Sequence, residues 1–275
     1  MSVGEIRSHF PALARVHGGY PVAYFDGPGG TQVPTSVVEA ITDYLLHHNA
    51  NSHWAYPTSV ETDMIIDAGR AAATARLNCA PNEVAFGANM PTLTFTLSRA
   101  LAPTLGKGDE IVITELDHHA NVAPWTRLAA ERGVVIRTAR MDVATGTLDW
   151  ASLEQQFSAR TKLLAIGGSS NALGTINDIA RATALAHEHG ALMHTDAVQS
   201  VGKIPVDVRA LGVDLLSLSA HKFSGPKGVG ALFIKRGTRM QPILTGGKHE
   251  RSRRAGTENA PAIVGMGVAA EETAG

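Results

Sequence analysis

Short apolar runs alternate along the chain with segments whose apolar residues recur at helical spacing, and Gly or Pro separates most of them. The apolar runs predict strands at residues 83–86, 110–114, 134–137, 163–167, 192–195, 215–219 and 230–235. The helical spacing predicts helices at residues 34–48, 92–101, 120–132 and 178–189, and Gly133 and Gly190 stop the last two. Strands that alternate with helices form parallel βαβ units, so we expect an α/β fold whose sheet carries helices on both faces.

Polar residues gather directly after several of these predicted strands. DHHAN follows the strand at 110–114, GSSNALG follows the strand at 163–167, and Asp196 and Lys222 each follow a later strand. Ligands of such folds bind beyond the carboxyl ends of the strands. The pattern therefore predicts a ligand site at one edge of the sheet.

Composition narrows the class of protein. The 275 residues hold 24 Lys and Arg against 25 Asp and Glu, which gives no reason to expect a nucleic acid or an anionic membrane as partner. The single cysteine, Cys79, excludes an intrachain disulfide and a cysteine-based metal site. No apolar run approaches the roughly 18 residues that span a bilayer, and the N-terminus lacks the apolar stretch of a secretion signal. We therefore expect a cytoplasmic protein.

Two residues after strands suggest cofactor chemistry. Lys222 follows an apolar strand and precedes Gly-Pro-Lys-Gly; a lysine there is either a solvated surface residue or a half-buried amine able to form a Schiff base with an aldehyde. Asp196 either caps the next segment or pairs with a protonated ring nitrogen. Pyridoxal 5′-phosphate (PLP) needs both an amine and such an acid, and the two residues stand one βαβ-sized step apart.

Other motifs favour no metal and no nucleoside triphosphate. His118 and His119 are adjacent in a loop and lack a third ligand at metal-site spacing, so we expect one imidazole to lie against a cofactor ring instead. FDGPGGT is typical of a tight turn. Gly247-Lys248 lacks the upstream Gly and the following Ser or Thr of a P-loop. GGKHERSRRAGTEN is either a solvated basic loop or a loop that helps to neutralise a phosphate.

These motifs resemble those of one enzyme family. HTDAVQSVGKIPVDVRALGVDLLSLSAHKFSGPKGVGALF resembles the cofactor-lysine region of class V aminotransferases, and specifically of cysteine desulfurases; GGKHERSRRAGTENAPAIVG is similar to the segment that follows it in that family. YFDGPGGTQVP, FGANMPTLTF and LDHHANVAPW resemble a cysteine-desulfurase-like branch of the same superfamily. The resemblance covers nearly the whole chain.

The resemblance implies the large domain of a type I PLP-dependent transferase, with a mainly parallel seven-stranded sheet. It implies that residues 1–25 belong to a small domain, that 26–262 form the PLP-binding domain, and that 263–275 begin a helix toward a C-terminal small domain. Relatives are longer, so we expect the catalytic cysteine and the substrate-binding arginine of the family to lie beyond this sequence.

The resemblance also implies residue roles around the cofactor. Those at the ring are Lys222 for the Schiff base, Asp196 for the pyridine nitrogen, His118 and Val198 for the two faces, Gln199 for the phenolic oxygen, and Asn171 near that oxygen and the substrate carboxylate. Those at the phosphate are Ser219, His221, and Met90 and Thr92 at the start of a helix, with Thr257 reaching the phosphate of a neighbouring subunit. Pro91 offers no N–H where the family's phosphate cup donates one.

The implied function is that of a PLP-dependent cysteine desulfurase, which converts L-cysteine to L-alanine and passes sulfur to a protein thiol in iron–sulfur cluster assembly. Lys222 and His118 are the implied catalytic residues. The implied partners are the amino-acid substrate, a second copy of the chain and a sulfur-acceptor protein. The alternatives are a selenocysteine lyase, an aminotransferase or an epimerase of the same class, or a PLP-fold protein without catalysis.

Overall fold

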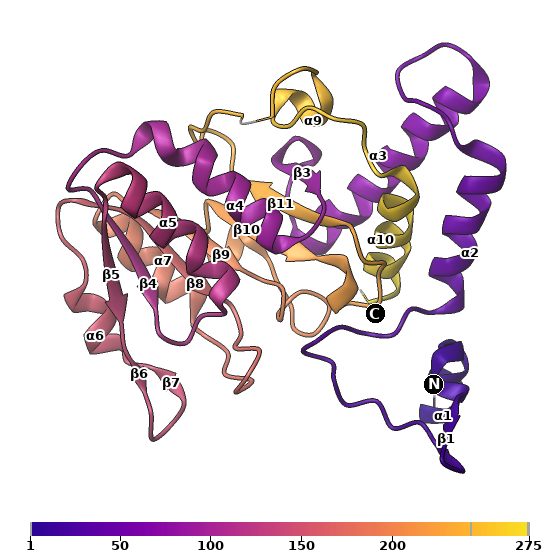
Figure 1. Cartoon of the computed structure of the whole chain (residues 1–275), viewed down its shortest axis with the longest axis horizontal. Helices are drawn as coiled ribbons and strands as arrows, with labels where there is room; N and C mark the ends of the chain where they lie inside the picture. Colours follow the sequence, from indigo (N-terminus) through magenta and orange to yellow (C-terminus); the bar gives the residue numbers. More distant parts are fainter. Residues whose placement is uncertain (1, 243, 274–275) are drawn as a thin grey trace.

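A central seven-stranded sheet organises the chain, as a computed structural model that describes residues 2–242 and 244–273 shows (Figure 1). Its strands follow the spatial order β3, β11, β10, β9, β8, β4, β5. Their bounds are β3 (Val84–Gly87), β4 (Glu110–Thr114), β5 (Val135–Ala139), β8 (Thr161–Gly167), β9 (Leu192–Asp196), β10 (Leu215–Ser219) and β11 (Gly230–Ile234). Each contains most of a strand that the apolar runs predict, and the α/β fold is confirmed.

One strand runs against the others. β11 pairs antiparallel with both β10 and β3, whereas the remaining neighbours in the sheet pair parallel. The connection at 220–229 between β10 and β11 is shorter than the dozen or more residues that a parallel crossover needs. As a result, β3, β4, β8, β9 and β10 all end at the same edge of the sheet.

Helices cover both faces because successive strand residues point to opposite sides. Ile111 and Ile113 of β4 share one apolar cluster with Leu97 and Trp125, from α4 (Met90–Leu101) and α5 (Ala123–Arg132). Val112, between those isoleucines, belongs to the opposite cluster. That second cluster also takes residues of α2 (Thr35–Asp43), α3 (Pro57–Leu77), α7 (Ile179–Glu188) and α10 (Ala260–Glu272).

Several helix boundaries differ from the predicted ones. The predicted helix at 34–48 ends at Asp43 and continues as a π-turn (Tyr44–His48). The predicted helix at 120–132 is a 3₁₀ turn (His119–Asn121) followed by α5, which Gly133 closes at φ 69°. The long helix α3 was not predicted, because its apolar positions form no clear stripe. Three further short helices are α6 (Trp150–Gln155), α8 (Val208–Leu211) and α9 (His249–Ser252).

The N-terminal segment lies apart from the sheet (Figure 1). It holds α1 (Val3–Ser8) and the two-residue strands β1 (Val16–His17) and β2 (Tyr20–Pro21), and no described residue before Gly30 is buried. A second small hairpin pairs β6 (Met141–Asp142) with β7 (Thr147–Leu148). Residue 1, the first of the predicted segment 1–25, and residues 274–275, the last of the predicted segment 263–275, lie outside the described residues. Within the described ranges, no helix has both the length and the apolar character to cross a lipid bilayer.

Candidate active site

The strand ends at the shared edge line a pocket with a cavity of about 170 Å³. Its walls include nine of the eleven predicted site residues, which are Met90, His118, Asn171, Asp196, Val198, Gln199, Ser219, His221 and Lys222. They follow five different strands and meet only because those strands end together. Thr92 and Thr257 do not line this pocket.

Asp196 is the acid in the floor of the pocket. It is the last residue of β9, and only 8% of its surface is exposed. One carboxylate oxygen accepts a hydrogen bond of 2.9 Å from the Val198 N–H. Burial raises the pKa of Asp196 to about 7, and the nearby Asp117 adds to the rise. A cationic group in the pocket would stabilise the charged form of Asp196.

Lys222 supplies the amine. It ends a 3₁₀ turn (Ala220–Lys222) that follows β10 directly, and its Nζ donates a hydrogen bond to the Pro28 carbonyl oxygen. Burial lowers the pKa of Lys222, while the charges of Asp26 and Asp196 oppose that shift. A larger fraction of the amine is therefore neutral, and hence nucleophilic, than on a freely solvated lysine.

The FDGPGGT stretch forms a tight turn against Lys222. The N–H groups of Gly29 and Gly30 both donate to the Asp26 carbonyl oxygen, at 3.1 and 3.2 Å. The Gln199 side chain donates to the Pro28 carbonyl oxygen at 2.9 Å, so one carbonyl binds both Gln199 and Lys222. The turn thus restrains two predicted cofactor contacts.

His118 faces the pocket from the turn after β4. Its Nδ1 accepts a hydrogen bond of 3.1 Å from the Ala120 N–H, so the neutral ring carries its proton on Nε2. His119, its neighbour, does not line the pocket. In the described part of the chain, no three His, Cys, Asp or Glu side chains are grouped to hold a metal ion.

The N–H groups of Met90 and Thr92, in the first turn of α4, already have hydrogen-bond partners. The Met90 N–H donates to Ser219 Oγ at 2.7 Å, and the Thr92 N–H and hydroxyl donate to Asn89 Oδ1 at 3.0 and 2.9 Å. Pro91, between them, has no N–H. The Ser219 hydroxyl and the His221 ring line the same pocket and can donate to an anion.

Thr257 lies elsewhere on the surface. It is exposed and borders a separate hollow with Asn49, Asn51 and Thr62, near the junction of α2 and α3. In this chain it is not part of the Lys222 pocket.

Pro28 and Asp117 are among the pocket residues that the sequence analysis did not predict. Pro28 contributes a backbone carbonyl, which no sequence pattern marks. Asp117 opens DHHAN, three residues after the predicted strand ends at Thr114, but the two histidines beside it drew the interpretation instead.

A mainly parallel sheet with a lysine and a buried aspartate at adjacent strand ends is the arrangement of α/β proteins that bind PLP through a Schiff-base lysine and an acid partner for the ring nitrogen. The chain belongs to the class V aminotransferase family, whose profile (Aminotransferase class-V) matches residues 23–273. This confirms the family that the motifs predict.

Individual relatives are cysteine desulfurases. The chain is 39% identical over 251 residues to a cysteine desulfurase of Bradyrhizobium diazoefficiens, across 90% of this chain and 63% of the relative. It is similar to the apo structure of cysteine desulfurase from Thermococcus onnurineus NA1, with a TM-score of 0.93, 28% identity, and coverage of 99% of this chain and 71% of that one. It is also similar to a structure of SspA in complex with cysteine, with a TM-score of 0.84, 29% identity, and coverage of 91% and 72%. The chain spans 63% of the length of the Bradyrhizobium relative.

Proposed function

We propose that this chain forms the PLP-binding part of a cysteine desulfurase, which releases L-alanine from L-cysteine and passes the sulfur to a thiol. The observation that carries the proposal is the pairing of the Lys222 amine with the buried Asp196 carboxylate in one pocket. Members of the family are PLP-dependent.

The residues of the pocket fit this cofactor at its ring. Asp196 is desolvated and has no cationic partner within salt-bridge distance among the described residues, so a protonated ring nitrogen would supply the missing charge. His118 and Val198 would flank the ring, Gln199 and Asn171 would contact its oxygen, and the phosphate would meet Ser219 and His221. PLP bound there would supply a ring that withdraws electrons from the substrate Cα.

The protein groups would then handle protons and orientation. Asp196 would hold the proton on the ring nitrogen. Lys222, whose pKa burial lowers, would accept the Cα proton of the substrate and return it. The Pro28 carbonyl oxygen accepts a hydrogen bond from the amine and holds it in the pocket.

The sulfur-accepting thiol is not supplied to this pocket by Cys79. That residue precedes β3, whereas the pocket lies beyond the end of β3, and four strand residues span roughly 13 Å. Burial also raises the pKa of Cys79 to about 12, which keeps the thiol protonated and unreactive. The second candidate is a class V activity that needs no protein thiol, such as a selenocysteine lyase or an aminotransferase.

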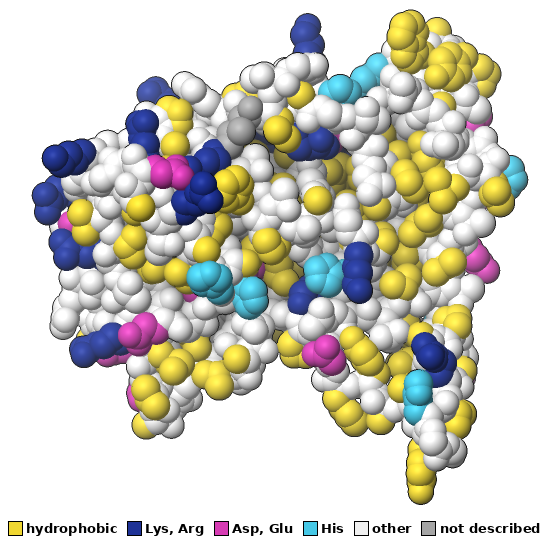
Figure 2. Space-filling model, in the orientation of Figure 1, with side chains coloured by type: hydrophobic (Ala, Val, Ile, Leu, Met, Phe, Trp, Pro, Cys, Tyr) yellow, Lys and Arg dark blue, Asp and Glu magenta, His cyan; other side chains and the backbone are white. Residues whose placement is uncertain are grey.

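A second copy of the chain would complete the site. An apolar patch of Leu45, Leu46, Trp54, Tyr56, Val60 and Met64 is exposed around the junction of α2 and α3 (Figure 2). The hollow beside Thr257 adjoins this junction. We infer that the patch packs against a second copy and that Thr257 reaches the partner's phosphate site. Light scattering with and without PLP tests this, since PLP held by both copies would stabilise the dimer.

Covalent labelling tests the cofactor assignment. The chain is incubated with PLP, reduced with borohydride and digested, and the pyridoxyl group is expected on the peptide that contains Lys222. Lys203 and Lys227 are the internal controls, and a label on either of them instead would overturn the assignment.

A second assay addresses the reaction. Alanine and sulfide formed together from L-cysteine and a small-molecule thiol indicate desulfurase chemistry. Transfer of the amino group to a 2-oxo acid, or alanine formed from L-selenocysteine but not from L-cysteine, would favour the second candidate.

A further inference from the structure

The Asp117 carboxylate joins the turn after β4 to the end of β8. Its Oδ1 accepts hydrogen bonds from the Gly167 N–H at 2.6 Å and from Asn121 Nδ2 at 2.9 Å, and its Oδ2 accepts one from Thr114 Oγ1 at 2.5 Å. Thr114 ends β4, and Asn121 ends the 3₁₀ turn that begins after His118. One side chain thereby fixes the turn that carries His118.

The link continues to Asp196 through β8. The Gly168 N–H, next along the chain from Gly167, donates to the Asp196 carbonyl oxygen at 2.8 Å. A Cβ atom at Gly167 would stand 3.1 Å from Asp117 Oδ1 and 4.0 Å from that carbonyl oxygen, so the three groups are closely packed. The turn that carries His118 is therefore linked to the backbone of Asp196 through the Asp117 carboxylate and the Gly167–Gly168 peptide.

Asp117 also brings a negative charge into the pocket. It lines the same cavity as Asp196 and Lys222, and within the described ranges no Lys or Arg forms an ion pair with it. Burial raises the pKa of Asp117 to about 6. Two charged groups act on the pKa of Asp196: Asp117 raises it, and Lys222 lowers it.

We propose that Asp117 is a positioning residue of this site, which holds the His118 turn against β8 and places a second carboxylate in the pocket of Asp196. This role rests on the proposed function, because Asp117 would orient His118 toward the cofactor and would add negative charge beside its cationic ring. With both carboxylates in the pocket, the charge of Asp117 adds to that of Asp196 in attracting a cationic group.

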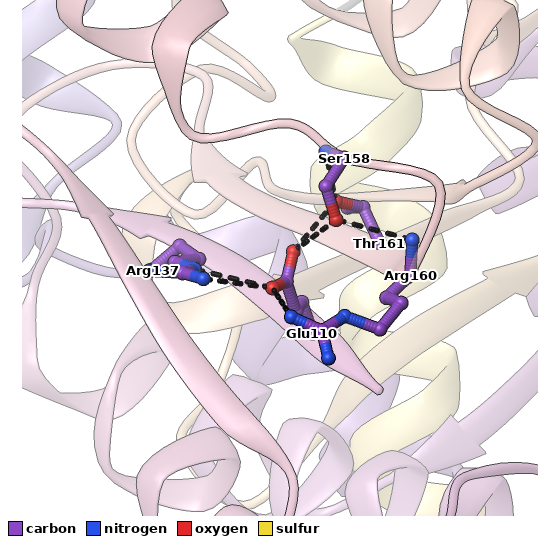
Figure 3. Close-up of polar contacts among 5 residues, drawn as sticks. All are labelled: Glu110, Arg137, Ser158, Arg160 and Thr161. Carbon is purple, nitrogen blue, oxygen red and sulfur yellow. Dashed lines mark hydrogen bonds and ion pairs between the residues drawn. The ribbon is translucent and has the colours of Figure 1, made fainter. Parts of the chain in front are cut away.

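A matched control stands at the other end of β4. Glu110, the first residue of that strand, is fully buried and also joins neighbouring segments: Ser158 Oγ donates to it at 2.6 Å and Arg137 Nη2 at 2.9 Å (Figure 3). It is a cross-linking carboxylate of similar kind, but it does not line the pocket. Substitution there reports the general cost of losing such a link.

The first experiment needs no cofactor. In protein labelled with ¹³C-aspartate, the carboxyl signal of Asp196 is assigned by its loss in Asp196→Asn and then titrated. Asp117→Asn retains an acceptor for the Gly167 and Asn121 groups but removes the charge, so the titration midpoint of Asp196 is expected to fall by about half a pH unit or more. Glu110→Gln is expected to leave the midpoint unchanged. An unchanged midpoint in Asp117→Asn would overturn the proposal.

The second experiment measures the equilibrium dissociation constant of PLP. Asp117→Ala leaves the Gly167 N–H without a partner and frees the His118 turn, so PLP is expected to bind at least tenfold more weakly. Glu110→Ala is expected to bind PLP as wild type does, even though it is less stable. Wild-type affinity in Asp117→Ala would refute the positioning role. If the wild-type chain itself bound no PLP, the proposed function would fail, while the Asp196 titration would still decide the role of Asp117.

Discussion

Replacing Glu250 with glutamine is expected to destabilise the chain strongly, because Glu250 belongs to a buried ion pair with Arg70, neither of which lines the pocket. Only 4% of Glu250 and 5% of Arg70 is exposed, and Arg70 donates to the two Glu250 oxygens at 2.9 and 3.1 Å. Glu250 also accepts a hydrogen bond of 3.0 Å from the Phe86 N–H, and Arg70 donates to the Val84 carbonyl at 2.9 Å. The pair therefore fastens α9 and its loop to α3 and β3.

The size of the effect follows from what remains after the substitution. Glu250→Gln retains an amide oxygen that accepts from the Phe86 N–H, but the Arg70 guanidinium stays buried without a counter-charge. Removing one partner of such a pair costs about 3–5 kcal/mol. At about 2–4 °C per kcal/mol for a domain of this size, the melting temperature is expected to fall by about 6–20 °C.

The double variant Arg70→Met, Glu250→Gln separates the charge from the packing. It buries no charge, keeps an acceptor for Phe86 and fills the space of the arginine stem, so it is expected to lose less stability than Glu250→Gln alone. Urea unfolding followed by circular dichroism gives the free energy of each protein. A loss below about 1 kcal/mol in Glu250→Gln, or a double variant less stable than that single variant, would refute the reasoning.

Three further outcomes are expected. Burial raises the pKa of Asp196 from 3.8 to about 7, so the folded cofactor-free chain retains a proton that the unfolded chain releases. The unfolding free energy should therefore fall by up to about 4 kcal/mol as pH rises from about 4 to about 7. Urea midpoints compared across that range should show that this part of the pH dependence vanishes in Asp196→Asn. Cys79, with a pKa raised to about 12, should react slowly with iodoacetamide at about pH 8. The Cys79→Ala variant should form alanine as the wild type does. If that substitution abolished turnover, Cys79 would be the sulfur acceptor. Gly202→Ala places a Cβ 2.4 Å from Phe223 Cβ at a φ of 78°, so a loss of about 1–3 kcal/mol is expected in thermal unfolding, and a wild-type melting curve would contradict the geometry.

The sequence alone determined the features that depend on near neighbours in the chain. The apolar run 110–114 became β4 with the same bounds, and Gly133 ended the following helix at a positive φ, because apolar β-branched runs and glycine stops act within a few residues. The rule that ligands bind at strand carboxyl ends then placed Asp196 and Lys222 at one edge without any coordinates. The resemblance supplied the cofactor.

Only the tertiary structure decided which polar groups were already engaged. The Met90 N–H is bonded to Ser219, 129 residues away, and Glu250 pairs with Arg70 across 180 residues. In the sequence, Asp117 is not distinguished from any other aspartate after a strand. Its partner, the Gly167 N–H, comes from the neighbouring strand and is visible only in the folded sheet. Hydrogen bonds and burial depend on distances between segments remote in sequence, and no local pattern encodes those distances. The sequence therefore predicts the residue types in the pocket, but the packing of the sheet determines which of their polar groups remain free to bind a ligand.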